Sequence, residues 1–201
     1  MKTHIIFDLG QVLINWFPEA AFQQHFDDEA AMKAWFEKID FNGWNRKQDG
    51  GRSFAEGLAA AHAAHGDLAA PLDDYLDRFG LTITQSNAGT WEIAENLKAN
   101  GHDLYAITNW AAETWPEARR RYPRLDDLFE DILVSGIEGM LKPDPGIYLT
   151  LCQRNGLRPQ DCLFIDDSAA NVQGAIDVGM DAIHFTSAGD LRNELTVRGI
   201  A

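Results

Sequence analysis

The chain has little cysteine and little positive charge. Its 201 residues include 2 cysteines, Cys152 and Cys162, which form neither a CxxC motif nor a disulfide framework. We therefore expect buried, reduced thiols in a cytoplasmic protein. Lys and Arg number 17 against 31 Asp and Glu, a formal net charge of −14. This balance argues against nucleic acid or an anionic membrane as a partner, because few cations are available to neutralise phosphates.

Long apolar runs are also missing. No run approaches the ~18 residues of a membrane span. The opening segment is not expected to be a secretion signal, because Asp8, Gly10 and Gln11 interrupt it and no Ala-x-Ala-like site follows. Hydrophobic residues make up 45% and charged residues 24%, as in globular proteins. The length suits one domain, or a core domain with a modest insertion. We expect a monomer or homodimer.

Short β-rich runs alternate with helical patterns. The runs are residues 4–7, 104–107, 132–134, 162–165 and 182–185, and the helical patterns between them include 87–100, 145–154 and 169–178. Short apolar runs are typical of strands buried on both faces of a parallel sheet. The alternation predicts an α/β fold, a Rossmann-like parallel sheet with helices on both faces.

One stretch, from about residue 18 to about residue 80, is helical throughout. We interpret it as a small helical cap (17–83) inserted after the first strand of a core domain (1–16 and 84–201). Such an insertion would lie above the carboxyl end of the sheet, where open α/β folds bind ligands, and would be a candidate lid. The alternative is a helical subdomain that only completes the core.

Polar residues end four of the strand runs: Asp8, Thr108-Asn109, Ser135 and Asp166-Asp167. Any one of them alone is most simply a helix N-cap. Together they would meet at one edge of a parallel sheet, where three carboxylates repel one another unless a divalent cation joins them. Oxygen-only ligands favour Mg²⁺ over zinc, which prefers His or Cys. His62 and His65 fit a solvated helix face.

Lys142 stands in Gly-Met-Leu-Lys-Pro-Asp-Pro, a turn that leads into a helix. A single Lys is by default a surface residue, but this turn can direct Lys142 to the sheet edge. There its ammonium group would hold a carboxylate nucleophile and neutralise an incoming anion. Together, the strand-end residues and Lys142 indicate phosphoryl transfer through an acyl phosphate, with positioning and charge neutralisation supplying the remaining catalysis.

These residues resemble the haloacid dehalogenase-like hydrolase superfamily, whose members are mostly Mg²⁺-dependent phosphatases. Four segments follow the order of the family's motifs: residues 7–13, 107–109, 142–143 and 164–171. The resemblance implies that Thr108, Asn109 and Lys142 bind the phosphoryl group. A helical insertion after the first motif resembles the family's type 1 cap.

The resemblance also implies a nucleophile and a metal site. Asp8 would be the nucleophile and, with Asp167 and the backbone carbonyl of Gly10, a Mg²⁺ ligand; Lys142 would assist catalysis. Asp166 and Asn171 would support the metal from the fourth motif. The expected activity is hydrolysis of a small phosphate ester through an aspartyl phosphate on Asp8.

Gly10 departs from the family's usual Asp-x-Asp motif, whose second Asp is the general acid and base. Glycine cannot protonate a leaving group, and such help is typically worth ~10²–10⁴-fold. Asp166 or a cap residue could substitute. Some members with Asp-Leu-Gly-x-Val act on sugar phosphates such as glucose 1-phosphate, and the easy departure of an anomeric phosphate would suit a missing acid.

Two alternatives stay open. A 2-haloacid dehalogenase would use Asp8 without metal, but its usual Asp-x-Tyr-Gly-Thr motif is absent. A non-catalytic phosphometabolite-binding protein would not be expected to keep every catalytic residue. The sequence's candidates for substrate specificity are Trp16, Trp44, Asn45, Arg46 and Arg52, with packing inside the cap as the alternative for Trp44.

Overall fold

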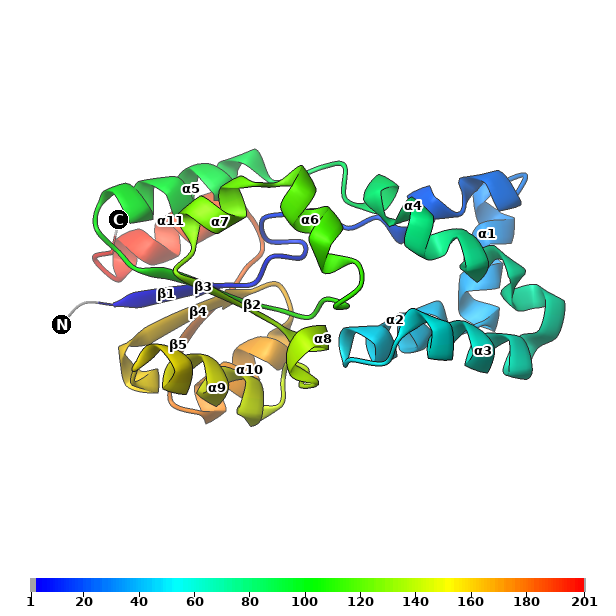
Figure 1. The fold of residues 1–201 in the computed structure, drawn as a ribbon. Coiled ribbons are helices and arrows are strands. Elements are labelled where there is room, and N and C mark those ends of the chain that lie inside the picture. Colours follow the sequence, from blue (N-terminus) through cyan, green and yellow to red (C-terminus); the bar gives the residue numbers. More distant parts are fainter. Residues whose placement is uncertain (1–2, 201) are drawn as a thin grey trace.

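The computed structural model describes residues 3–200, and its centre is a five-stranded parallel sheet (Figure 1). The strand order is β3-β2-β1-β4-β5, which confirms the predicted α/β class. The strands are β1 (His4–Phe7), β2 (Leu104–Thr108), β3 (Asp131–Val134), β4 (Cys162–Asp166) and β5 (Asp181–His184). The last was expected at 182–185. It begins one residue earlier, and Phe185 still continues the pairing by donating its N–H to Asp166 O at 2.8 Å.

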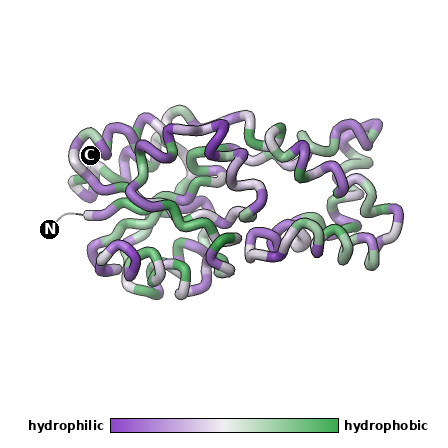
Figure 2. Tube along the Cα trace, viewed as in Figure 1, coloured by the Kyte–Doolittle hydropathy of each residue, from purple (hydrophilic) through white to green (hydrophobic). Residues whose placement is uncertain are grey.

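Helices cover both faces of the sheet. One face carries α5 (Ala88–Ala99), α7 (Arg124–Leu128) and α11 (Ala188–Val197), and the other carries α9 (Pro145–Asn155) and α10 (Ala169–Asp177). The central strands are buried on both sides and are the most hydrophobic part of the trace (Figure 2). Two short helices, α6 (Trp115–Arg121) and α8 (Ser135–Glu138), follow the carboxyl ends of β2 and β3. Both cysteines are free and buried, as expected.

The stretch between β1 and α5 is helical, as predicted, and we call residues 18–82 the helical insertion. Its elements are η1 (Pro18–Ala21), η2 (Gln23–His25), α1 (Glu29–Lys38), α2 (Phe41–Asp49), α3 (Phe54–His65), η3 (Gly66–Asp74) and α4 (Tyr75–Thr82). Aromatic rings form its centre: Phe22 stacks on Tyr75 with centroids 5.2 Å apart, and Phe41 packs edge-on against both. The division into a core domain and a cap at 17–83 stays a prediction.

The chain leaves and re-enters the sheet domain along two adjacent segments. Asn15 N donates to Gln85 O at 3.0 Å, and Phe17 N donates to Thr82 O at 2.8 Å. The insertion therefore extends from the carboxyl edge of the sheet, and α2 lies beside α8 (Figure 1). This position places insertion side chains over the strand ends.

None of the helices in residues 3–200 is both long and apolar enough to cross a membrane.

Candidate active site

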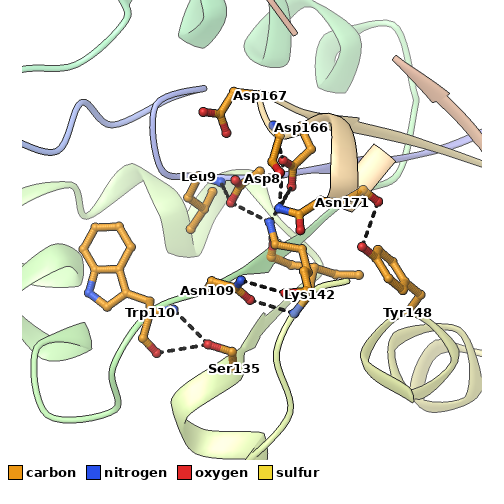
Figure 3. Close-up of polar contacts among 12 residues, drawn as sticks. Asp8, Leu9, Asn109, Trp110, Ser135, Lys142, Tyr148, Asp166, Asp167 and Asn171 are labelled. Atoms are coloured by element: carbon orange, nitrogen blue, oxygen red, sulfur yellow. Dashed lines mark hydrogen bonds and ion pairs between the residues drawn. The ribbon is translucent and has the colours of Figure 1, made fainter. Parts of the chain in front are cut away.

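Lys142 lies at the centre of the polar strand ends (Figure 3). Its side chain is 0% exposed, and its Nζ lies 2.9 Å from Asp8 Oδ1 and 2.6 Å from Asp166 Oδ2. Nζ also donates to the carbonyl of Ile107 at 2.9 Å. Because β1, β2 and β4 are adjacent and parallel, their ends deliver all three oxygens to this one ammonium group. The turn before α9 thus brings Lys142 to the sheet edge, as predicted.

Asn109 fixes the backbone at Lys142. Lys142 N donates to Asn109 Oδ1 at 2.9 Å, and Asn109 Nδ2 donates to Lys142 O at 3.1 Å. Arg46, from the insertion, donates to the same carbonyl at 3.3 Å. The side-chain amide of Asn109 thus positions the lysine with one of its two N–H groups, because the turn at 142 lies within reach of the end of β2. Its expected role in phosphate binding stays a prediction.

Asp166 is held by the start of α10. Asn171 Nδ2 donates to both carboxylate oxygens, at 3.0 and 3.1 Å, and Ser168 N donates to Oδ1 at 2.8 Å. Tyr148 in turn donates its hydroxyl to the carbonyl of Asn171 at 2.8 Å. Asn171 therefore orients Asp166 and turns its amide nitrogen, a donor, toward the carboxylates. Its expected support of a metal would act through Asp166.

Asp8, Asp166 and Asp167 form a cluster whose oxygens lie within 4.8 Å of one another. Asp8 Oδ1 accepts a bond from Leu9 N at 2.6 Å and also faces Lys142. Among the described residues no bond is made to Asp8 Oδ2, which can therefore bind a metal or a ligand. Asp167 is exposed and lies on the side of the cluster away from Lys142 (Figure 3). One ammonium does not balance three carboxylates, and an all-oxygen donor set suits Mg²⁺.

Gly10 can complete that donor set only through its backbone. Its carbonyl accepts a bond from Val12 N at 2.7 Å, and a carbonyl oxygen has a second lone pair. An ideal Cβ at Gly10 would meet no heavy atom within 4 Å. In an Asp-x-Asp motif a carboxylate side chain would stand at this position. In this chain the space beside Gly10 is open.

The burial of these charges changes their protonation. Desolvation raises the pKa of Asp8 to about 7, although Lys142 opposes the rise. Desolvation and the neighbouring Asp166 raise the pKa of Asp167. Burial alone would lower the pKa of Lys142, but Asp8 and Asp166 outweigh it and raise that pKa above its ordinary value. A divalent cation would favour the ionised carboxylates.

Thr108 carries an unpaired hydroxyl at the end of β2. The residue is 1% exposed, and its Oγ1 has no hydrogen-bond partner among the described residues. Buried hydroxyl groups are normally paired, because an unmade hydrogen bond costs ~1–3 kcal/mol. The hydroxyl follows Ile107, whose carbonyl binds Lys142. The Thr108 hydroxyl can therefore donate to a ligand oxygen, and its role in binding phosphate stays a prediction.

A cavity of about 100 Å³ adjoins this edge, between the sheet domain and the insertion. It is lined by Gly10, Gln11, Trp16, Asn45, Asp49, Phe79, Asn109, Trp110 and Thr114. Trp16 and Asn45 therefore lie on this cavity, and Arg46 donates to the Lys142 carbonyl. Their roles in substrate specificity stay predictions.

Trp44 and Arg52 do not line this cavity. Trp44 is buried in the insertion, where its Nε1 donates to Gly57 O at 2.8 Å and its ring packs on Phe54. Arg52 donates to Gln48 Oε1 at 2.6 Å and to Trp44 O at 3.2 Å. The structure thus corrects the expectation that these two side chains reach the cavity, because both bond within the insertion. For Trp44 this is the alternative of packing inside the cap.

Sequence reasoning missed Asp49 and did not assign Trp110 to the site. Asp49 ends α2 one helical turn after Asn45, whose Nδ2 donates to Asp49 Oδ2 at 3.0 Å. That i, i+4 spacing is the signal that could have found it. Trp110 N donates to Ser135 Oγ at 2.9 Å, and Ser135 Oγ donates to Asp49 O at 2.5 Å. Ser135, one of the predicted strand-end residues, therefore joins the sheet edge to the insertion.

Comparisons with known proteins find similar hydrolases. Residues 2–179 match the family model described as haloacid dehalogenase-like hydrolase. Flavin mononucleotide hydrolase 1 of Arabidopsis thaliana is 34% identical over 112 residues, which are 56% of this chain but only 45% of that protein. Sesquiterpene phosphatase astK of Aspergillus oryzae is 27% identical over 185 residues, 91% of this chain and 89% of that one.

A solved structure shares the fold. It is a HAD family enzyme from Bacteroides thetaiotaomicron in complex with magnesium and inorganic phosphate, with a TM-score of 0.73 and 20% identity. The match covers 93% of this chain and 96% of that one.

Proposed function

The chain belongs to the haloacid dehalogenase-like hydrolases, and we propose that it is a Mg²⁺-dependent phosphatase acting through an aspartyl phosphate on Asp8. One observation carries the proposal: Asp8 lies 2.9 Å from a buried ammonium group at an edge that also holds the unpaired hydroxyl of Thr108. A nucleophile, a cation and a donor for an anionic oxygen thus converge. Such convergence is what phosphoryl transfer requires of a protein.

Each residue has a defined part in this chemistry. Asp8 attacks phosphorus with a carboxylate oxygen, a phosphoryl oxygen takes a bond from Thr108 Oγ1, and the ammonium charge of Lys142 neutralises the phosphoryl group. Water then cleaves the acyl phosphate and regenerates Asp8. Asp8, Asp167 and the Gly10 carbonyl would hold Mg²⁺, which would supply charge neutralisation when bound. Asp166, fixed by Asn171, keeps Lys142 in place.

The substrate we propose is a small phosphorylated metabolite, with sugar phosphates as the first class to test. The cavity beside Gly10 has room for several water-sized groups and combines the rings of Trp16 and Trp110 with the polar side chains of Asn45 and Asp49. A compact polar leaving group with one apolar face fits such a lining.

The test is phosphate release from p-nitrophenyl phosphate and a panel of sugar phosphates, with Mg²⁺ and with EDTA. We expect Mg²⁺-dependent release that Asp8→Asn abolishes while the variant still unfolds cooperatively. Metal-independent halide release from 2-chloropropionate, with no phosphate release, would favour a dehalogenase instead. Binding of a phosphate ester without turnover would favour a non-catalytic protein.

A further inference from the structure

The sheet edge itself provides no free acid for the leaving group. Position 10 is glycine, and both oxygens of Asp166 accept bonds, from Lys142, Asn171 or Ser168. Asp167 belongs to the proposed metal site. A proton donor for the proposed reaction therefore has to come from the opposite wall of the cavity.

Asp49 is the carboxyl group on that wall. It lines the same cavity as Gly10 and Asn109, and a Cβ at Gly10 would meet no heavy atom within 4 Å. Asn45 binds its Oδ2 at 3.0 Å, and the Ser135 hydroxyl binds its backbone carbonyl at 2.5 Å. The first contact orients the carboxyl group, and the second connects the end of α2 to the sheet domain.

The surroundings of Asp49 keep it protonated near neutral pH. Desolvation raises its pKa to about 8, against opposing effects of Arg46 and of hydrogen bonds from the Ala111 backbone and Asn45. Tyr75, within the insertion, also interacts with it electrostatically. A carboxylic acid with a pKa close to the working pH suits proton transfer in both directions.

Other charged groups on the elements packed against Asp49 are already paired. Glu113, on the loop after β2, accepts a bond from Phe54 N at 2.7 Å. Glu138, on α8, pairs with Arg154 at 2.6 Å. Neither residue lines the cavity.

We propose that Asp49 is the general acid and base of this enzyme, replacing the carboxyl group missing at position 10; this rests on the proposed phosphatase function. As Asp8 forms its bond to phosphorus, the bond from phosphorus to the ester oxygen breaks, and that oxygen takes the proton of the Asp49 carboxyl group. Asp49 is then a carboxylate. In the second step it takes a proton from the attacking water, as the bond between phosphorus and Asp8 breaks, and inorganic phosphate leaves.

The test compares Asp49→Asn with wild type on two substrates of similar shape, phenyl phosphate and p-nitrophenyl phosphate. Phenolate is much the poorer leaving group, so its departure depends more on a proton. The constant to measure is kcat/KM, which covers the steps up to departure of the leaving group. Asp77→Asn is the matched control, because Asp77 is an exposed insertion carboxylate on α4 outside this cavity.

We expect Asp49→Asn to lose roughly 10²-fold or more on phenyl phosphate, within the range of general acid catalysis, and under about 10-fold on p-nitrophenyl phosphate. For wild type, kcat/KM on phenyl phosphate should fall as pH rises above about 8, where Asp49 loses its proton. Asp49→Asn should lack that alkaline limb. Asp77→Asn should match wild type on both substrates.

Two results would overturn the assignment of Asp49 without contradicting the proposed phosphatase function. One is wild-type rates for Asp49→Asn on both esters; the other is an equal loss on both, which would indicate a structural role. Activity of Asp49→Asn on p-nitrophenyl phosphate shows that the variant is folded. The proposed function itself would fail in a different way: the wild-type protein would show no Mg²⁺-dependent phosphate release.

Discussion

Replacing Lys142 with Met tests the electrostatics of the buried site. Methionine keeps much of the side-chain volume but removes the ammonium group that lies 2.9 Å from Asp8 and 2.6 Å from Asp166. Removing one partner of a buried ion pair typically costs ~3–5 kcal/mol, because the remaining charge is left without compensation. We expect a loss of that size in the free energy of unfolding at pH 7.5 without metal.

The loss should shrink as the pH falls. In the folded Lys142→Met variant, a carboxylate takes up a proton to replace the missing positive charge, whereas the unfolded chain stays ionised down to about pH 4. The folded variant then binds more protons than the unfolded chain, so its stability rises as pH falls. One extra proton relative to wild type corresponds to about 1.4 kcal/mol per pH unit. The deficit at pH 6 should therefore be roughly 2 kcal/mol smaller than at pH 7.5.

Urea unfolding in EDTA at both pH values measures the effect. Lys98→Met is the control, because Lys98 pairs with Glu130 at the surface and such pairs contribute at most ~1 kcal/mol. The reasoning would be refuted if Lys142→Met were as stable as Lys98→Met at pH 7.5. A deficit independent of pH would refute the charge argument and leave only a packing effect.

Two further substitutions follow from the same site. Thr108→Val should lower kcat/KM for p-nitrophenyl phosphate by roughly 10- to 100-fold. Thermal unfolding should change little, since the hydroxyl has no hydrogen-bond partner within residues 3–200. Thr108→Ser should retain activity, and equal losses in both variants would contradict the role as donor. Asn171→Ala removes two bonds to Asp166 and should lower the free energy of unfolding by ~1–3 kcal/mol. Urea unfolding beside the exposed control Asn193→Ala checks this, and equal stability of the two would refute it.

The sheet and the gathering of its polar strand ends could be predicted from the sequence. Strands buried on both faces show as continuous apolar runs, and parallel strands place their carboxyl ends on one edge. Asp8, Thr108 and Asp166 therefore had to come close together. The edge strand β5 is less well defined by this signal, because only part of it is buried, and its position was displaced by one residue.

Partners of individual side chains could not be predicted in this way. Asn109 and Lys142 are 33 residues apart, and their paired hydrogen bonds depend on how the turn before α9 reaches β2. In the insertion, the helical pattern does not say which face of α2 meets the sheet domain. Trp44 and Arg52 proved to face inward, while Asn45, in the same helix as Trp44, faces the cavity.

Asp49 shows why the acid of this site is hard to find from sequence. A second carboxylate in the first motif would lie two residues from the nucleophile and could be recognised by spacing alone. Asp49 is 41 residues from Asp8 in the sequence and reaches the cavity only because α2 packs against α8 through the bond from Ser135 to the Asp49 carbonyl. In the sequence, Asp49 looks like any carboxylate on the solvent-facing side of a helix. Its raised pKa comes from burial between two parts of the chain. The proposed replacement for the carboxyl group missing at Gly10 thus depends on a tertiary contact, which no local motif specifies.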